Sequence, residues 1–197
     1  MSFQNNFGKL REIGRMLVLP TNEIKNLLKR NVFDKYSINK VIDFGAGTLY
    51  WSNWFSKIIG KQNVYAVDVI FQKTPPDTDI KCFSCIDDVE IKQEKTLFYI
   101  CDVIHHLPND VWNDVKNKAF EKCDIVVIKD IDCRYKFKNF MNKMHDRIIN
   151  GEKIHNVNPD NLIKDFKTSG FIYIYIYIYN IHKLWYSHFV IIAQKYK

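Results

Sequence analysis

The stretch VIDFGAGTLYW, residues 41–51, constrains the fold of this chain more than any other part of the sequence. Its apolar residues up to Phe44 are typical of the end of a buried strand, because they do not alternate with polar residues. Gly45 and Gly47 follow, and glycine allows unusual backbone angles as well as the close approach of a ligand. From Thr48 onward apolar residues recur at helical spacing. A strand, a glycine turn and a helix form a unit that holds nucleotides, and a tight turn without a ligand is the alternative for so short a match.

A second acidic residue makes the nucleotide interpretation more specific. The strand pattern NVYAVDVI occupies residues 63–70 and includes Asp68 near its end. Asp68 lies about 20 residues beyond the glycine turn, which is the distance at which an acid accepts hydrogen bonds from the two ribose hydroxyls of a nucleoside. We therefore expect a cofactor that contains a nucleoside.

The residues around the glycine turn favour a cationic cofactor. Asp43 lies two residues before Gly45, and a carboxylate at this point would repel a diphosphate. S-adenosylmethionine carries a sulfonium and an ammonium group, so it suits this site. With Asp43, Gly45 and Gly47 in place, the sequence resembles the class I S-adenosylmethionine-dependent methyltransferases, whose first motif has an acid followed by glycines at alternate positions. Leu49 departs from the motif, because many members have a third glycine there.

The resemblance continues in LFYICDVIHHLP, residues 97–108, which is similar to the fourth-strand segment of small-molecule and lipid-type members. Asp102, His105 and His106 match its Asp-Val-x-His-His stretch. We expect the cofactor to be held mainly by the first two strands. The residues expected to contact S-adenosylmethionine are Asp43, Phe44, Gly45, Ala46, Gly47, Asp68, Val69, Asp87 and Asp102.

The pattern of the whole chain predicts an α/β fold. Strands and helices alternate after residue 41, which indicates a mostly parallel sheet. Residues 124–130 resemble the fifth strand of the family, and residues 171–195 resemble its closing hairpin. The resemblance therefore implies a Rossmann-like doubly wound sheet of seven strands, of which the last is antiparallel.

Length and composition agree with one domain. A chain of 197 residues with 47% hydrophobic residues can form a single sizeable core. We expect residues 1–197 to be one methyltransferase domain, with N-terminal helices at about residues 8–33 that form a lid over the cofactor site, as in the family. No apolar run is long enough to cross a membrane, and no secretory signal is visible, so we expect a cytoplasmic protein.

Charge and cysteines give weaker indications. The net charge of +7 suits an acidic partner such as nucleic acid or a membrane surface, but the lysines are scattered, and a lysine-rich surface is the simpler explanation. Cys82 and Cys85 form a CxxC without a second pair at zinc spacing. We expect buried free thiols among the five cysteines and predict no metal site.

Side chains that could assist methyl transfer gather where the strands end, because ligands bind beyond the carboxyl ends of a parallel sheet. A histidine suits the removal of a proton from an alcohol or phenol, and the alternative is that it only shapes the pocket. The candidate catalytic residues are His105, His106, Lys129, Asp130, His145 and His188. The hairpin residues expected at the same edge are His182, Lys183, Trp185 and Tyr186.

The sequence favours a small-molecule, lipid or saccharide acceptor that is methylated on oxygen or nitrogen. No Asp/Asn-Pro-Pro-aromatic stretch follows the fourth strand, which argues against amino-methylation of DNA bases. Cys101 and Cys123 lack the context of enzymes that attack pyrimidine carbon. The pairs Asp130/Asp132 and His145/Asp146 could bind a polar acceptor or a metal, with a solvated loop and a helix cap as the alternative. An RNA or protein methyltransferase, and a non-catalytic S-adenosylmethionine-binding protein of the same fold, remain alternatives.

Overall fold

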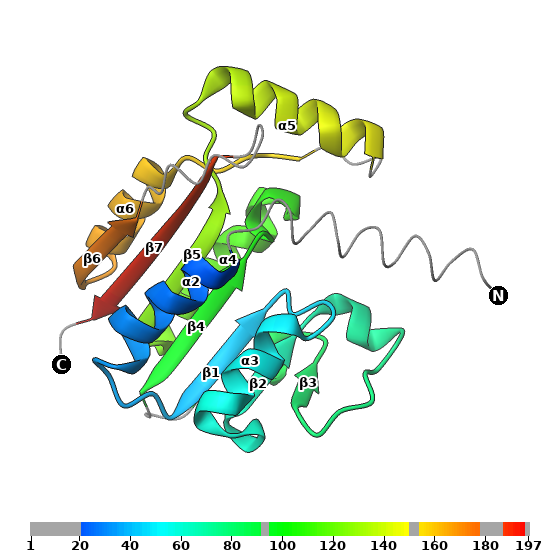
Figure 1. Cartoon of the computed structure of the whole chain (residues 1–197), viewed down its shortest axis with the longest axis vertical. Coiled ribbons are helices and arrows are strands. Elements are labelled where there is room, and N and C mark those ends of the chain that lie inside the picture. The colour runs from blue at the N-terminus through cyan, green and yellow to red at the C-terminus, as the bar shows by residue number, and fades with distance from the viewer. Residues whose placement is uncertain (1–20, 92–94, 150–153, 178–186, 196–197) are drawn as a thin grey trace.

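The computed structural model describes residues 21–91, 95–149, 154–177 and 187–195 (Figure 1). These residues form one sheet of seven strands in the order β3-β2-β1-β4-β5-β7-β6. The strands are β1 (Lys40–Phe44), β2 (Val64–Val67), β3 (Lys81–Phe83), β4 (Thr96–Cys101), β5 (Ile125–Ile131), β6 (Phe171–Tyr177) and β7 (His188–Lys195). Strands β1 to β5 run parallel to one another, whereas β7 is antiparallel to both β5 and β6. The prediction of a mostly parallel sheet with an antiparallel last strand is confirmed.

Helices connect the strands and cover the sheet. The α-helices are α2 (Thr21–Leu28), α3 (Tyr50–Ile59), α4 (Asn109–Lys122), α5 (Lys136–Ile149) and α6 (Pro159–Thr168). The shorter helical turns are η1 (Lys29–Phe33), η2 (Lys61–Asn63), η3 (Val69–Gln72), η4 (Ile86–Asp88) and η5 (Ile104–His106). Within this part of the chain, no helix has the length and apolar character needed to span a bilayer.

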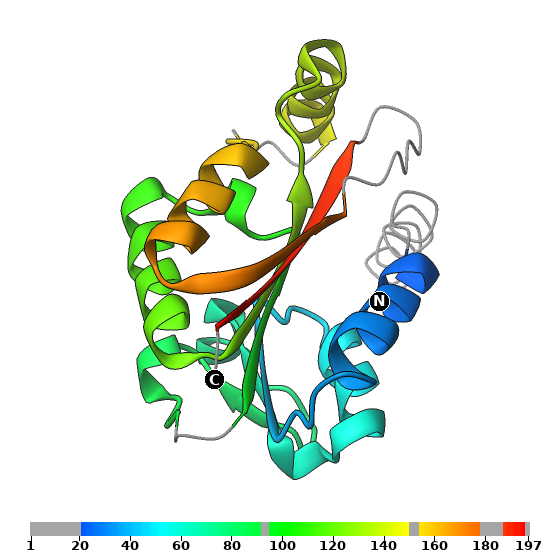
Figure 2. The same cartoon turned by 90° about the vertical axis from the view of Figure 1, so that its left-hand side faces the viewer.

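The sheet separates two hydrophobic layers, as expected for a doubly wound fold. Helices α2 and α3 cover one face, and α4 and α6 cover the other (Figure 2). Because successive strand residues point to opposite faces, Val41 of β1 packs in the layer beneath α2 and α3, and Ile42 packs beneath α4 and α6. Tyr99 and Phe98 of β4 divide in the same way. The sheet is therefore buried on both sides, which explains the nearly continuous apolar runs in the sequence.

Only part of the segment expected to form an N-terminal lid belongs to the described residues. Residues 8–20 lie outside the described residues. Residues 21–33 form α2 and η1, whose Ile24, Leu27 and Leu28 are buried against the sheet. This part contributes to the core, and its role as a lid stays a prediction.

Two elements differ from the sequence expectations at their ends. The strand expected over residues 63–70 ends at Val67, because the Asp68 carboxylate accepts the N–H of Ile70 and begins η3. The Ile/Tyr run forms β6 at the edge of the sheet, where Ile172 is 61% exposed. The alternation of Ile and Tyr in this run predicts a strand, which is confirmed. In a sheet covered on both faces both side-chain rows can be buried, but Ile172 instead faces solvent.

Candidate functional site

The carboxyl ends of the parallel strands form one edge of the sheet, and the loops that follow β1, β2 and β4 are each bonded to a neighbouring strand. The backbone N–H of the first loop residue donates to a carbonyl at the end of the adjacent strand in each case. These bonds are Gly45 N to Val67 O (2.8 Å), Asp68 N to Phe83 O (3.0 Å) and Asp102 N to Lys129 O (2.9 Å). The backbone of the edge is thus fixed by the protein itself.

Gly45 and Gly47 are both needed for the turn after β1, but for different reasons. Their φ angles are 76° and 49°, in the left-handed region that favours glycine. A Cβ on Gly45 would lie 2.2 Å from Cγ2 of Val103, so the chain's own side chain fills this space. A Cβ on Gly47 would meet only the carbonyl oxygen of Gly45, at 4.0 Å. The open approach to the main chain is therefore at Gly47.

Leu49, which stands at the position of the third motif glycine, also has a left-handed backbone. Its φ is 63°, and its side chain is buried in the layer beneath α2 and α3. The N–H of Leu49 donates to the carbonyl of Ala46 at 2.8 Å, and α3 then begins at Tyr50 rather than at Thr48. Leu49 thus adopts the left-handed backbone that glycine usually provides. The burial of its apolar side chain offsets the strain of that conformation.

Asp43 lies directly beneath this turn and is only 2% exposed. The hydroxyl of Ser52, on α3, donates to its carboxylate at 2.5 Å. Burial raises the pKa of Asp43 to about 7, although hydrogen bonds from Ser52 oppose this rise. Asp43 therefore lacks a strong partner for its negative charge, and a cation nearby would stabilise the charged form.

Asp68 joins the ends of β1 and β2. One carboxylate oxygen accepts the N–H of Gly47 at 2.8 Å, and the other accepts the N–H of Ile70 at 3.0 Å. Val69 is 78% exposed and Ile70 is 52% exposed, which is unusual for two consecutive apolar residues beside an acid. The acid and an apolar surface therefore lie next to the open side of the turn.

Of the other predicted cofactor residues, Phe44 is the last residue of β1, Ala46 lies in the turn after it, and Asp87 lies in η4. The Asp87 carboxylate is on the surface and pairs with Lys118 of α4 at 2.7 Å. This hydrogen-bonded pair lowers the pKa of Asp87. The structure therefore gives Asp87 a partner on a helix, and its contact with the cofactor stays a prediction.

Asp102 follows β4 and is held by a buried lysine. Its φ of 56° is left-handed, and both of its carboxylate oxygens lie 2.5 Å from Nζ of Lys129. Burial would raise the pKa of Asp102, but the charges of Lys129, His188 and His105 outweigh it and lower this pKa to about 2. Asp102 thus stays negative at neutral pH and keeps a partly exposed carboxylate at the edge.

A second buried pair joins His105 to Asp130, the residue after Lys129. Nδ1 of His105 lies 2.5 Å from the Asp130 carboxylate, which also accepts the N–H of Ile104 at 3.0 Å. Burial lowers the pKa of His105, but Asp130 more than offsets this effect and raises it. His188, at the start of β7, is also buried and faces the end of β5 in the sheet register. The structure therefore brings His105, Lys129, Asp130 and His188 together, but in the interior.

The remaining catalytic candidates lie elsewhere. His106 is exposed, and its ring centroid lies 4.1 Å from that of His105. His145 belongs to α5, which projects beyond the sheet (Figure 1). The hairpin candidates His182, Lys183, Trp185 and Tyr186 lie outside the described residues.

The acidic pairs and cysteines do not converge on a metal in the described part of the chain, where no group of three or more His, Cys, Asp or Glu could hold one. Asp132 instead pairs with Arg134 at 2.6 Å, while Asp130 pairs with His105. All five cysteines are free. Cys123 is buried but Cys85 is exposed, so the expectation of buried thiols is wrong for Cys85.

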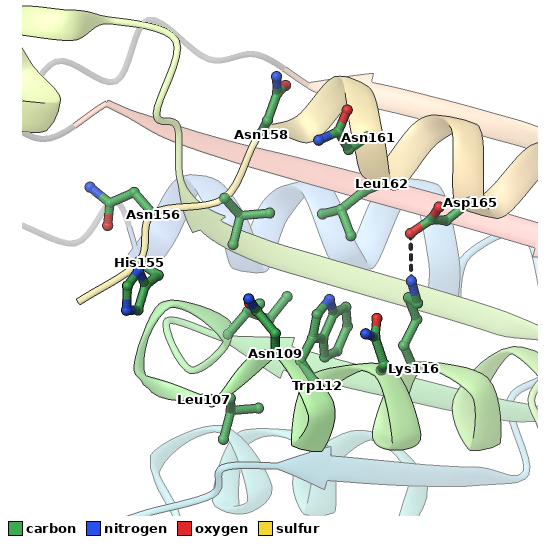
Figure 3. A pocket seen from close by; sticks show the side chains of 13 residues that line it. Leu107, Asn109, Trp112, Lys116, His155, Asn156, Asn158, Asn161, Leu162 and Asp165 are labelled. Atoms are coloured by element: carbon green, nitrogen blue, oxygen red, sulfur yellow. Dashed lines mark hydrogen bonds and ion pairs between the residues drawn. The ribbon is translucent and has the colours of Figure 1, made fainter. Parts of the chain in front are cut away.

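A polar cavity of about 220 Å³ lies between α4 and α6, on the face opposite α3 (Figure 3). It reaches Ile104 and Leu107 at the η5 end, and an ion pair of 2.6 Å between Lys116 and Asp165 closes the side shown at the right of Figure 3. Amide side chains and one indole dominate its lining: Asn109, Asn113, Asn156, Asn158, Asn161 and Trp112.

Sequence reasoning did not identify several of these residues. Ser52 could have been found from its position on the helix after Asp43. Val103 could not, because its contact with Gly45 depends on the pairing of β1 with β4. The cavity residues carry one signal, the asparagines at helical spacing in α4 (Asn109 and Asn113).

Comparisons with known proteins agree with this fold. No protein-family model and no curated protein matches the sequence. The structure is similar to that of a SAM-dependent methyltransferase from Archaeoglobus fulgidus, with a TM-score of 0.68 and 14% identity, over 94% of this chain and 99% of that one. It is also similar to magnesium protoporphyrin IX methyltransferase from Synechocystis with bound SAH (TM-score 0.61, 12% identity, 89% of this chain and 83% of that one). An O-methyltransferase family protein from Burkholderia thailandensis gives a TM-score of 0.65 and 11% identity, over 91% of this chain and 57% of that one. The chain has the fold of S-adenosylmethionine-dependent methyltransferases, as its motifs led us to expect.

Proposed function

We propose that this chain is an S-adenosylmethionine-dependent methyltransferase. The observation that supports this most directly is the junction of β1 and β2, where the Asp68 carboxylate lies 2.8 Å from the backbone nitrogen of Gly47. The approach to Gly47 is open, so a ligand can reach both the main chain and the acid. An acid at the end of the second strand is suited to accept the two hydroxyls of a ribose.

The residues at this edge fit S-adenosylmethionine. Asp68 would hold the ribose, and the exposed Val69 and Ile70 would cover one face of the adenine ring. Asp102, whose pKa is about 2, offers a permanent negative charge for the ammonium group. Asp43 offers a charge that a cation would stabilise. When bound, S-adenosylmethionine supplies a methyl group on a positively charged sulfur, and the protein's task is to hold the acceptor in line with it.

The buried pairs act as positioning residues in this proposal. Lys129 and Asp130 fix Asp102 and the η5 turn from behind, and all three charges are held by short contacts. His106 is the candidate for removing a proton from the acceptor, because it is exposed at the same turn. His106→Gln should then lower kcat about a hundredfold or more without changing the cofactor Kd, as expected for the loss of a general base.

We propose that the cavity between α4 and α6 holds the acceptor, since it begins at η5 beside His106. Its amides donate and accept hydrogen bonds without net charge, and Trp112 offers a flat apolar face. This lining suits a neutral, hydroxyl-rich acceptor such as a saccharide or the polar part of a lipid. Trp112→Ala should raise KM with little effect on the cofactor Kd, whereas Lys164→Ala, an exposed change on α6, should affect neither.

Cofactor binding is tested by thermal unfolding with S-adenosylmethionine and with its demethylated product. Both should raise Tm, because a ligand that binds only the folded state stabilises it. Asp68→Ala should remove most of this rise, whereas Asp77→Ala, an exposed carboxylate in the loop before β3, should keep it. If neither nucleoside shifts the wild-type Tm, the proposed function is wrong.

The acceptor is then sought by incubating the protein with labelled S-adenosylmethionine and a cell extract. A labelled small molecule, lipid or saccharide supports the proposal in full. Labelled RNA or protein would support the alternative acceptors, and cofactor binding without any labelled product would indicate a non-catalytic binding protein.

A further inference from the structure

Helix α5 exposes an apolar row to solvent. Phe137 is 75% exposed, Phe140 is 59% exposed and Met144 is 41% exposed. These residues lie three and four positions apart, so they share one face of the helix. A surface helix of a globular domain normally turns such a face toward the core.

The side of α5 that faces the body is polar instead. Asn142 is fully buried, and the amide nitrogen of Asn156 donates to the side-chain oxygens of Asn139 and Asn142, each at 2.7 Å. At 100° per residue, the two asparagines of the helix lie on the side opposite the apolar row. Helix α5 is therefore amphipathic in the reverse sense, with amides inside and aromatic rings outside.

Exposed cations run beside the apolar row. Lys136, Lys143 and Arg147 are all exposed, and their spacing of seven and four residues places them in one stripe. Helical geometry puts this stripe next to the row of Phe137 and Phe140. A row of apolar side chains flanked by cations is the arrangement of helices that lie in the interface of an anionic membrane.

We propose that α5 docks this protein on the surface of an anionic lipid bilayer, with Phe137, Phe140 and Met144 inserted and the cations at the headgroups. The net charge of +7 adds to the attraction. A second copy of the chain is a poorer occupant, because a symmetric contact through this face would bring the two cation stripes close together. An RNA strand would pair with the cations but would not use a continuous apolar row that includes Met144.

The position of α5 gives the docking a consequence for the edge described above. Helix α5 follows the end of β5 and projects beyond the carboxyl edge of the sheet (Figures 1 and 2). A bilayer bound at α5 would therefore lie on the same side of the molecule as the proposed site. The docking itself rests on α5 alone and not on the proposed function.

The test is sedimentation of the full chain with vesicles of phosphatidylcholine plus phosphatidylglycerol, and with vesicles of phosphatidylcholine alone. We expect binding to the anionic vesicles, weakened by salt, and little binding to the neutral ones. Phe137→Ser/Phe140→Ser should weaken binding at least about tenfold, from the loss of two inserted rings. Lys136→Gln/Lys143→Gln should weaken it about 25-fold, since each cation near the surface is worth about fivefold.

Matched controls separate docking from general effects. Ile172→Ser changes an exposed apolar residue of β6, and Lys164→Gln/Lys167→Gln removes two exposed lysines of α6. Ile172→Ser should bind vesicles as the wild type does. Lys164→Gln/Lys167→Gln, which removes the same charge from α6, should weaken binding less than Lys136→Gln/Lys143→Gln. All variants change exposed side chains, and circular dichroism with Tm verifies that they fold.

Four results would overturn the proposal. The wild type does not bind anionic vesicles, or the double phenylalanine variant binds as tightly as the wild type. Alternatively, light scattering shows a dimer that the phenylalanine changes dissociate, or a single-stranded RNA binds through the same residues, while vesicles do not bind. These last outcomes would assign the face to a second copy or to RNA.

Discussion

Replacement of Asp43 by asparagine measures how strongly the fold retains a proton beneath the glycine turn. Burial is the main cause that raises the pKa of Asp43 from 3.8 to about 7. At about 1.4 kcal/mol for each pKa unit, this rise corresponds to about 4 kcal/mol. Asparagine keeps the shape of the side chain and can accept the hydrogen bond from Ser52, but it carries no charge.

The sign follows from proton binding in the two states. Between about pH 4 and about pH 7 the folded protein keeps the proton on Asp43, and the unfolded chain releases it. The free energy of unfolding therefore falls as the pH rises through this range, and the loss is complete above about pH 7. Asp43→Asn removes this loss, so the stability of the variant relative to the wild type should increase by about 4 kcal/mol between about pH 4 and about pH 8.

Urea unfolding of both proteins across this pH range gives the difference directly. Asp77→Asn, which removes an exposed carboxylate, is the control and should show no such trend. A difference between Asp43→Asn and wild type that stays constant within about 1 kcal/mol would refute the reasoning, because Asp43 would then titrate alike in both states. Above about pH 7, the variant should also lose preference for S-adenosylmethionine over its uncharged-sulfur product.

Further predictions concern the turn and the buried pair. Gly45→Ala should cost about 2–4 kcal/mol of stability from overlap with Val103 and its left-handed backbone, and Val103→Ala in the same chain should recover part of it, as urea unfolding would show. Leu49→Gly should be more stable than Leu49→Ala by about 1 kcal/mol, since glycine relieves the strain at φ 63°. A Leu49→Ala variant more stable than Leu49→Gly would contradict this. Lys129→Met should cost about 3 kcal/mol at neutral pH by leaving Asp102 without its partner, and addition of Asp102→Asn should restore part of the loss. If Lys129→Met alone and Lys129→Met with Asp102→Asn were equally stable, the pairing of Lys129 with Asp102 would be contradicted.

The sequence was sufficient for the fold because local patterns and chain order agree. The strand predicted to end at Phe44 is β1, and the helical pattern predicted after the glycine turn is α3. The glycine turn and the position of Asp68 after the second strand were also predicted, since their spacing follows from one strand–helix–strand unit, and the contact of Asp68 with a cofactor stays a prediction. These features depend on contacts close in sequence or on the regular order of a parallel sheet.

The rest depended on distant contacts that no local pattern records. Lys118 reaches Asp87 from a different helix, and Val103 fills the space beside Gly45. The burial of His105 also followed from tertiary structure, because its partner Asp130 lies on the next strand. The motif therefore predicted the position of His105 in the chain, but the neighbouring residues in the sequence could not show that its side chain is buried.

The backbone bonds that tie the loops after β1, β2 and β4 to the neighbouring strands determine the heat-capacity change of ligand binding. Since Gly45, Asp68 and Asp102 are already fixed by Val67, Phe83 and Lys129, a ligand at this edge has little main chain to order. Calorimetry of such binding should give a small negative heat-capacity change that reflects only the apolar surface covered, such as that of Val69 and Ile70. Binding at this edge should therefore lack the large heat-capacity change that accompanies the folding of a loop around its ligand.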